Sequence, residues 1–186
     1  MKRLIVAWAV LIATIACGGA GSGGTDSQAG PAGGAAGSGP AAGLTLVPHT
    51  TLETFLPAMP GWTFEYQPRG DTDPVERYAR VQLNYERGEN GMSIEIVDTM
   101  KNPNVLGPLT AVLASDAAAE QEGKTRTTVG GFPGVQEWTP EPRNGEVSVL
   151  LADRFVVRAV GSTVPDLATI RAAVEAVDLQ KLAGLK

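Results

Sequence analysis

The chain has 186 residues, with 15 lysines and arginines against 20 aspartates and glutamates, which gives a formal net charge of −5. An acidic chain without a basic stripe is poorly suited to neutralise phosphates, which argues against nucleic-acid binding. The sequence holds one cysteine and one histidine. An internal disulfide is therefore excluded, and a typical zinc site is disfavoured.

The first 16 residues are typical of a secretory signal peptide. Lys2 and Arg3 give a positive start, and the 13 residues at positions 4–16 are apolar except for Thr14. As a helix this run would span about 20 Å, short of the roughly 30 Å hydrocarbon core of a bilayer. Its length therefore favours a cleaved signal peptide over a transmembrane helix.

The single cysteine, Cys17, follows the apolar run directly. Ala16 and Cys17, with small residues after them, resemble the bacterial lipobox, although Thr14 stands where leucine is commonest. The resemblance implies that a diacylglycerol is linked to Cys17, that cleavage precedes it, and that the membrane is a partner through this anchor. Gly18 is not the aspartate of inner-membrane retention, which implies the outer membrane where the organism has one, and otherwise the outer face of the plasma membrane. The alternative is an ordinary signal peptide with an incidental cysteine.

Residues 17–43 are predicted to form a disordered tether. The 26 residues after Cys17 contain eleven glycines, seven alanines and three serines, with no aromatic or large aliphatic side chain. Such a segment cannot bury enough apolar surface to offset its chain entropy. A coil of this composition reaches about 26–31 Å root-mean-square, enough to hold a domain clear of a membrane surface.

Residues 44–186 have the size of one globular domain. Removal of residues 1–16 leaves 13 basic and 20 acidic residues, a net charge of 13 − 20 = −7.

Period-two alternation predicts strands and period-3.6 patterning predicts helices. Taken in chain order, the predicted elements are a short helix capped by Thr50 or Thr51 and ended by Pro57, a strand at 61–66, a loop at 71–74, a hairpin of strands 78–85 and 92–96 with its turn at 88–91, a helix at 103–120, strands at 125–129, 134–139, 146–152 and 154–160, and a helix at 165–177.

This order of elements predicts an α+β fold with a largely antiparallel sheet of about six to seven strands and helices packed on it. The segments at 127–138 (TTVGGFPGVQEW) and 153–161 (DRFVVRAVG), together with Pro60-Gly61-Trp62 and the run IEIVDT at 94–99, resemble the PsbP/DcrB-like proteins. That group includes many small exported or lipid-anchored bacterial proteins, mostly accessory or assembly factors. The resemblance covers roughly residues 50–180 and assigns no site residue.

The polar residues show no catalytic, metal or cofactor motif. His49 is expected in an exposed loop, and no serine elbow accompanies it. Asp71 and Asp73 alternate like calcium ligands, but Val75 and Glu76 break the pattern.

Two carboxylate pairs, Glu95 with Glu86 and Asp98 with Glu137, are indistinguishable from solvated strand positions. Trp62 and Trp138 are expected to be half-buried packing residues, and they are also the candidates for a ligand or partner surface.

These observations favour a non-enzymatic accessory or binding domain. It would bind another envelope protein or a small ligand through its sheet face or loops. The alternatives are a hydrolytic or metal-dependent envelope enzyme without a recognisable motif, and a structural spacer.

Overall fold

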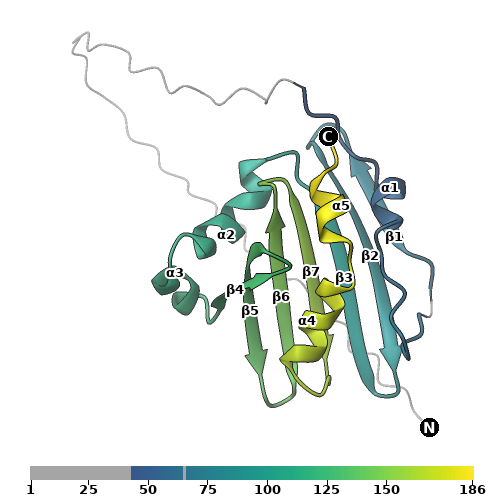
Figure 1. The fold of residues 1–186 in the computed structure, drawn as a ribbon, viewed down its shortest axis with the longest axis vertical. Coiled ribbons are helices and arrows are strands. Elements are labelled where there is room, and N and C mark those ends of the chain that lie inside the picture. Colours follow the sequence, from purple (N-terminus) through teal and green to yellow (C-terminus); the bar gives the residue numbers. More distant parts are fainter. Residues whose placement is uncertain (1–42, 65) are drawn as a thin grey trace, which may run out of the picture. The chain divides into compact units, whose positions relative to one another are not determined.

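The computed structural model describes residues 43–64 and 66–186, so the predicted signal peptide, Cys17 and nearly all of the tether lie outside the described residues. Seven strands form one sheet in the order β1-β2-β3-β7-β6-β5-β4, with every pairing antiparallel and helices packed on it (Figure 1). The predicted α+β class is therefore confirmed, while the finer PsbP/DcrB-like assignment stays a prediction. The helices are α1 (His49–Glu53), α2 (Pro103–Leu113), α3 (Asp116–Gln121), α4 (Leu167–Glu175) and α5 (Leu179–Ala183); the strands are β1 (Arg69–Asp73), β2 (Tyr78–Arg87), β3 (Asn90–Asp98), β4 (Thr125–Val129), β5 (Phe132–Thr139), β6 (Asn144–Leu151) and β7 (Phe155–Ser162).

One face of the sheet carries the main hydrophobic core. Alternate residues along the central strands point to this face, as the period of two requires, and α1, α4 and α5 cover it (Figure 1). The strand residues of this core are Ala79, Val81, Leu83, Tyr85, Met92, Ile94, Ile96, Val129, Val147, Val149, Leu151, Phe155, Val157 and Ala159.

Helix α4 lies unusually close to β7. A Cβ atom at Gly161 would come within 2.7 Å of Ile170 Cγ1, so only glycine allows this approach. Asp166 caps the helix, because its carboxylate accepts a hydrogen bond from the backbone N–H of Thr169 at 2.8 Å. From the same helix Arg171 donates to the backbone carbonyl of Thr128, which covers part of the exposed edge of β4.

A buried ion pair fastens the start of the domain to the sheet. Arg154 Nη2 lies 2.6 Å from Asp98 Oδ2, and the side chains of Arg154 and Asp98 are 3% and 0% exposed. Asp98 also accepts a hydrogen bond from the backbone N–H of Val47 at 2.9 Å, and Arg154 donates to the carbonyl of Thr45. Residues 45–47 are thereby held at the end of β3.

The predicted strand at 61–66 is wrong. Among its described residues only Thr63 pairs with the sheet, in a single bridge to Glu86. The outermost strand is instead β1, which includes most of the segment 71–74 that was predicted to be a loop. Pairing with β2 fixes this edge strand, since its own burial pattern is mostly exposed.

The predicted helix at 103–120 is two helices. Ser115 is extended, with φ −158° and ψ 159°, and its hydroxyl accepts from the N–H of Ala118, which begins α3. The short N-terminal helix starts at His49 after Pro48, without the expected capping bond from Thr50 or Thr51. Helix α5, capped by Asp178, was not predicted.

Candidate functional site

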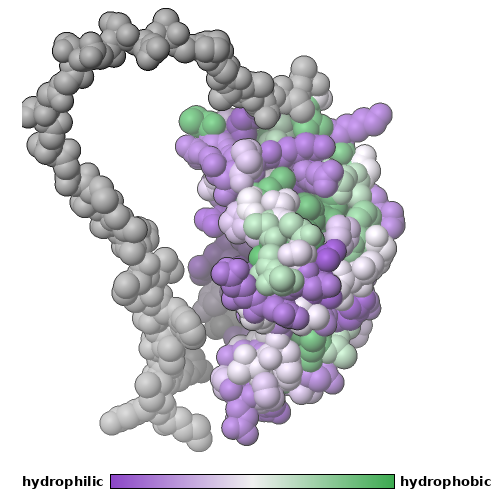
Figure 2. Space-filling model, turned by 90° about the vertical axis from the view of Figure 1, so that its left-hand side faces the viewer, coloured by the Kyte–Doolittle hydropathy of each residue, from purple (hydrophilic) through white to green (hydrophobic). Residues whose placement is uncertain are grey.

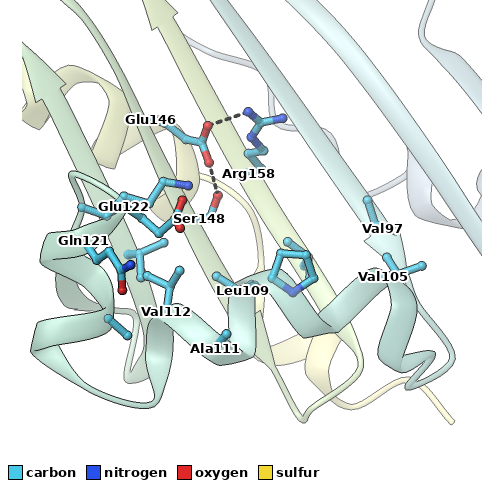
Figure 3. A pocket seen from close by; sticks show the side chains of 15 residues that line it. Val97, Val105, Leu109, Ala111, Val112, Gln121, Glu122, Glu146, Ser148 and Arg158 are labelled. Carbon is cyan, nitrogen blue, oxygen red and sulfur yellow. Dashed lines mark hydrogen bonds and ion pairs between the residues drawn. The ribbon is translucent and has the colours of Figure 1, made fainter. Parts of the chain in front are cut away.

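Helices α2 and α3 cover only part of the second face of the sheet. They contact β5 through a small cluster of Val112, Ala119 and Val135. Between the two helices and the neighbouring strands lies a groove of about 550 Å³ (Figure 3). Figure 2 looks onto the left-hand side of the domain in Figure 1, where α2 and α3 lie, and shows apolar surface bordered by hydrophilic side chains.

The walls of the groove are mainly apolar, as in most ligand sites. Helix α2 supplies one wall, and its interior Pro108 lies in it. Val105 forms part of the rim and is 38% exposed. The apolar lining residues are Val97, Val105, Pro108, Leu109, Ala111, Val112, Ala118, Val135 and Val156.

The floor of the groove is polar and comes from the middle of the sheet. Ser148 in β6 lies directly opposite Arg158 in β7, and Glu146 is two residues before Ser148 on the same face. Arg158 Nη2 lies 2.5 Å from Glu146 Oε2, and Ser148 Oγ donates to Glu146 Oε1 at 2.8 Å (Figure 3). Both oxygens of Glu146 therefore have a partner.

The ion pair at the floor shifts both pKa values toward the charged forms. Burial raises the pKa of Glu146, but the hydrogen bond and charge of Arg158 and the hydrogen bond of Ser148 outweigh it, so the pKa lies below its usual 4.5. The hydrogen bond that Arg158 donates to Glu146 raises the pKa of Arg158 against the effect of burial, and the negative charges of Glu146, Glu95 and Glu137 raise it further. The carboxylate is therefore a weak base.

The polar floor continues across the sheet as one row of opposed residues. Gln82 in β2 faces Glu95 in β3, Glu95 faces Arg158, and Arg158 faces Ser148. A shallow hollow over this row is lined by Gln82, Ser93, Glu95, Arg158 and Val160. It shares Arg158 with the groove, so groove and hollow adjoin; together they are named the trough.

The two tryptophans suggested by the sequence do not line the groove. Both are half-buried and pack against the core, and Arg87 lies over the Trp62 ring at 4.7 Å from its centre. Trp62 is next to β2 through the Thr63 bridge, whereas Trp138 is in β5. Four strand spacings, about 19 Å, separate β2 from β5, so the structure does not bring them together. Their role as a ligand or partner surface stays a prediction.

The other candidate groups are held in local contacts. His49 Nδ1 lies 2.8 Å from Thr72 Oγ1 in a half-buried position, rather than in an exposed loop. The carboxylate of Asp73 accepts from the N–H groups of Val75 and Glu76. Within residues 43–64 and 66–186, no three His, Cys, Asp or Glu side chains converge as metal ligands. In the same residues no helix is both long and apolar enough to cross a membrane.

The carboxylates considered as pairs from the sequence have other neighbours in the structure. Asp98 is buried against Arg154, whereas Glu137 is half-buried on the face that carries Glu146. Glu95 Oε2 lies 4.0 Å from Arg158 Nη1. The sequence did not single out Glu146, Ser148 and Arg158. The available signal was that these polar residues alternate with valines in their strands.

Comparison with known proteins gives no family assignment. No family model matches the chain, and no curated protein matches it. A solved structure that shows some similarity is the crystal structure of MucB in complex with MucA(peri), at 19% identity and a TM-score of 0.30. The match covers 65% of this chain and 34% of the MucB chain, so it spans about one third of that protein. A likeness at this level assigns neither fold nor function.

Proposed function

We propose that this chain is an exported, lipid-anchored protein whose domain binds a partner in the cell envelope and catalyses no reaction. The observation that carries the binding role is the groove between α2–α3 and the sheet, with apolar walls over a polar floor. An open apolar groove with a few convergent polar groups is the usual form of a binding site. The sequence resemblance to PsbP/DcrB-like accessory proteins supports the same class of role.

The state of the polar floor supports binding over hydrolysis. A serine nucleophile needs a neighbouring base with a pKa near the working pH. The neighbour of Ser148 is Glu146, whose pKa is lowered and whose oxygens already accept from Ser148 and Arg158. His49 bonds Thr72 in the outermost strand β1 and does not line the groove.

The proposed anchor is Cys17, supported by the signal-peptide pattern and the lipobox-like Ala16-Cys17. One acyl chain gives marginal membrane binding, whereas two or three, at about 0.8 kcal/mol per buried methylene, hold a protein firmly. We expect intact-mass measurement of the native protein to find an N-terminal acylated Cys17. Cys17→Ser should move the protein from the membrane to the soluble fraction, and Ser22→Ala should not. A native product with a bare or missing Cys17 would contradict the anchor.

The binding role is tested by photocrosslinking in the organism that makes the protein. A photoreactive amino acid replaces Val105 at the groove rim, and a second strain carries it at Val75. Val75 is 84% exposed in the β1–β2 turn and does not line the groove, so it is a matched control. The proposal predicts a discrete crosslinked partner from position 105 and none from position 75. Equal, diffuse crosslinking from both positions would refute it.

A further inference from the structure

The trough has the shape of a site for an elongated ligand. It runs at right angles to the strands, from Gln82 in β2 across β3, β7 and β6 to Val135 in β5. Four strand spacings make this about 19 Å, the length of roughly six residues of an extended chain at about 3.3 Å each. The combined length suits a peptide segment better than a compact molecule.

The two ends of the trough differ in chemistry. Beneath α2 the lining is mainly apolar and includes Leu109, Val112 and Val135, although Glu122 and Lys124 also line the groove. Over β3 and β7 the lining consists of Gln82, Ser93, Glu95, Arg158 and Val160. An occupant that matches both ends has apolar side chains at one end and polar or charged groups at the other.

The charges of the polar end favour a cation. Arg158 already forms an ion pair with Glu146. The negative charges of Glu95 and Glu137 also raise the pKa of Arg158. A bound anion at Arg158 would therefore meet the carboxylates of Glu146 and Glu95. Glu95 lies 4.0 Å from Arg158, beyond hydrogen-bonding distance, so its carboxylate has the capacity for a second cation. Over the whole trough Glu95, Glu122 and Glu146 face Lys124 and Arg158, a net charge of −3 + 2 = −1.

We infer that the trough holds an extended segment of a partner protein in which apolar residues adjoin a lysine or arginine. The apolar side chains lie under α2, and the basic side chain lies over Glu95. This inference rests on the proposed binding function and specifies the chemistry of the partner.

The test measures binding of a defined probe to the protein as cells produce it, kept without detergent in phosphatidylcholine nanodiscs. The probe is a fluorescein-labelled hexapeptide of three apolar residues, a glycine and two lysines, followed by fluorescence anisotropy. We expect it to bind at least tenfold more tightly than the same peptide with glutamates in place of the lysines. Lauric acid, which shares the apolar part but carries an anionic head, should not displace it.

Matched variants locate the binding. Val105→Asn removes apolar contact at the rim and should weaken binding by about fivefold to tenfold. Glu95→Gln removes the proposed partner of the cation and should weaken it by about threefold. Val75→Asn and Glu53→Gln are exposed controls away from the trough and should leave the affinity unchanged. Circular dichroism establishes that each variant is folded.

The outcomes separate this inference from the proposed function. Equal or tighter binding of the glutamate peptide, displacement by lauric acid, or equal losses in the control variants would overturn the inference. If crosslinking from position 105 still captures a partner, the binding role stands and only the chemistry of the segment is wrong. Loss of both results would refute the binding role as well.

Discussion

Two arginine–carboxylate pairs in this domain differ in burial, and this difference separates their roles. Arg154 and Asp98 are almost completely buried and bond the backbone of residues 45–47, so they serve the fold. The side chains of Arg158 and Glu146 are 45% and 13% exposed at the floor of the groove, where a ligand can reach them. The residue types alone do not distinguish the pairs, but their burial does.

Removal of one partner of the buried pair should destabilise the domain strongly. Asp98→Ala leaves the Arg154 guanidinium buried without its counter-charge, and we expect a loss of about 3–5 kcal/mol in the free energy of unfolding. Asp116→Ala is the control, because it breaks the exposed pair with Arg126 and should cost less than about 1 kcal/mol. Denaturant titration measures both variants. Similar, small losses would show that the buried pair is not structurally important.

Glu146 should make stability depend on pH. Its pKa in the folded state lies below the ordinary 4.5, so its contribution is present above that value and is lost as the pH falls through the folded pKa. We expect Glu146→Gln to lower the free energy of unfolding by about 1 kcal/mol at pH 7. The difference from the unaltered protein should shrink below about pH 4.5. A difference that stays constant from pH 7 to pH 3 would contradict the assigned ion pair.

At the scale of elements, alternation predicted the strands that face the core and missed those that tertiary pairing determines. The strands around Val81, Ile94 and Val157 alternate clearly and were predicted. β1 has no such pattern and exists because it pairs with β2. The aromatic alternation at Trp62 and Phe64 looked like a strand, but Trp62 packs against the core while Phe64 is 56% exposed.

The helix predicted at 103–120 shows the same limit of local patterning. Its apolar spacing continues past Leu113, so the pattern gave no stop. The break arises from Ser115, whose side chain caps a second helix instead of continuing the first. A serine inside an otherwise apolar pattern was the available signal, but serine also occurs within helices.

The close contact between α4 and β7 should tolerate no side chain at position 161. In Gly161→Ala the added methyl would meet Ile170 and Val164 at 2.7–2.8 Å, so the helix must shift. Overpacking of this kind costs about 1–3 kcal/mol. Gly91→Ala is a matched control in the neighbouring strand, since its added Cβ would have only Ser162 nearby, at 3.9 Å. Thermal unfolding of the two variants tests this, and equal midpoints would contradict the described packing.

At the scale of the whole domain, helices cover the two faces of the sheet to different extents. The core face is covered by α1, α4 and α5, and the other is covered only in part by α2 and α3, which leaves the trough. The class of fold was predictable from the order of elements. The site was not, because Glu95, Glu146 and Arg158 come together only in the strand order β3-β7-β6.

The central claim is that a partner occupies the groove, and blocking the groove tests it most directly. A photoreactive residue at Gln121, which lines the groove and is exposed, reports occupancy in living cells. In the same strain Val105→Trp places a large side chain at the rim, and Val75→Trp adds the same bulk in the β1–β2 turn. The account predicts that the crosslinked complex is lost with the tryptophan at position 105 and kept with the one at position 75. An equally strong crosslink in both strains would contradict it.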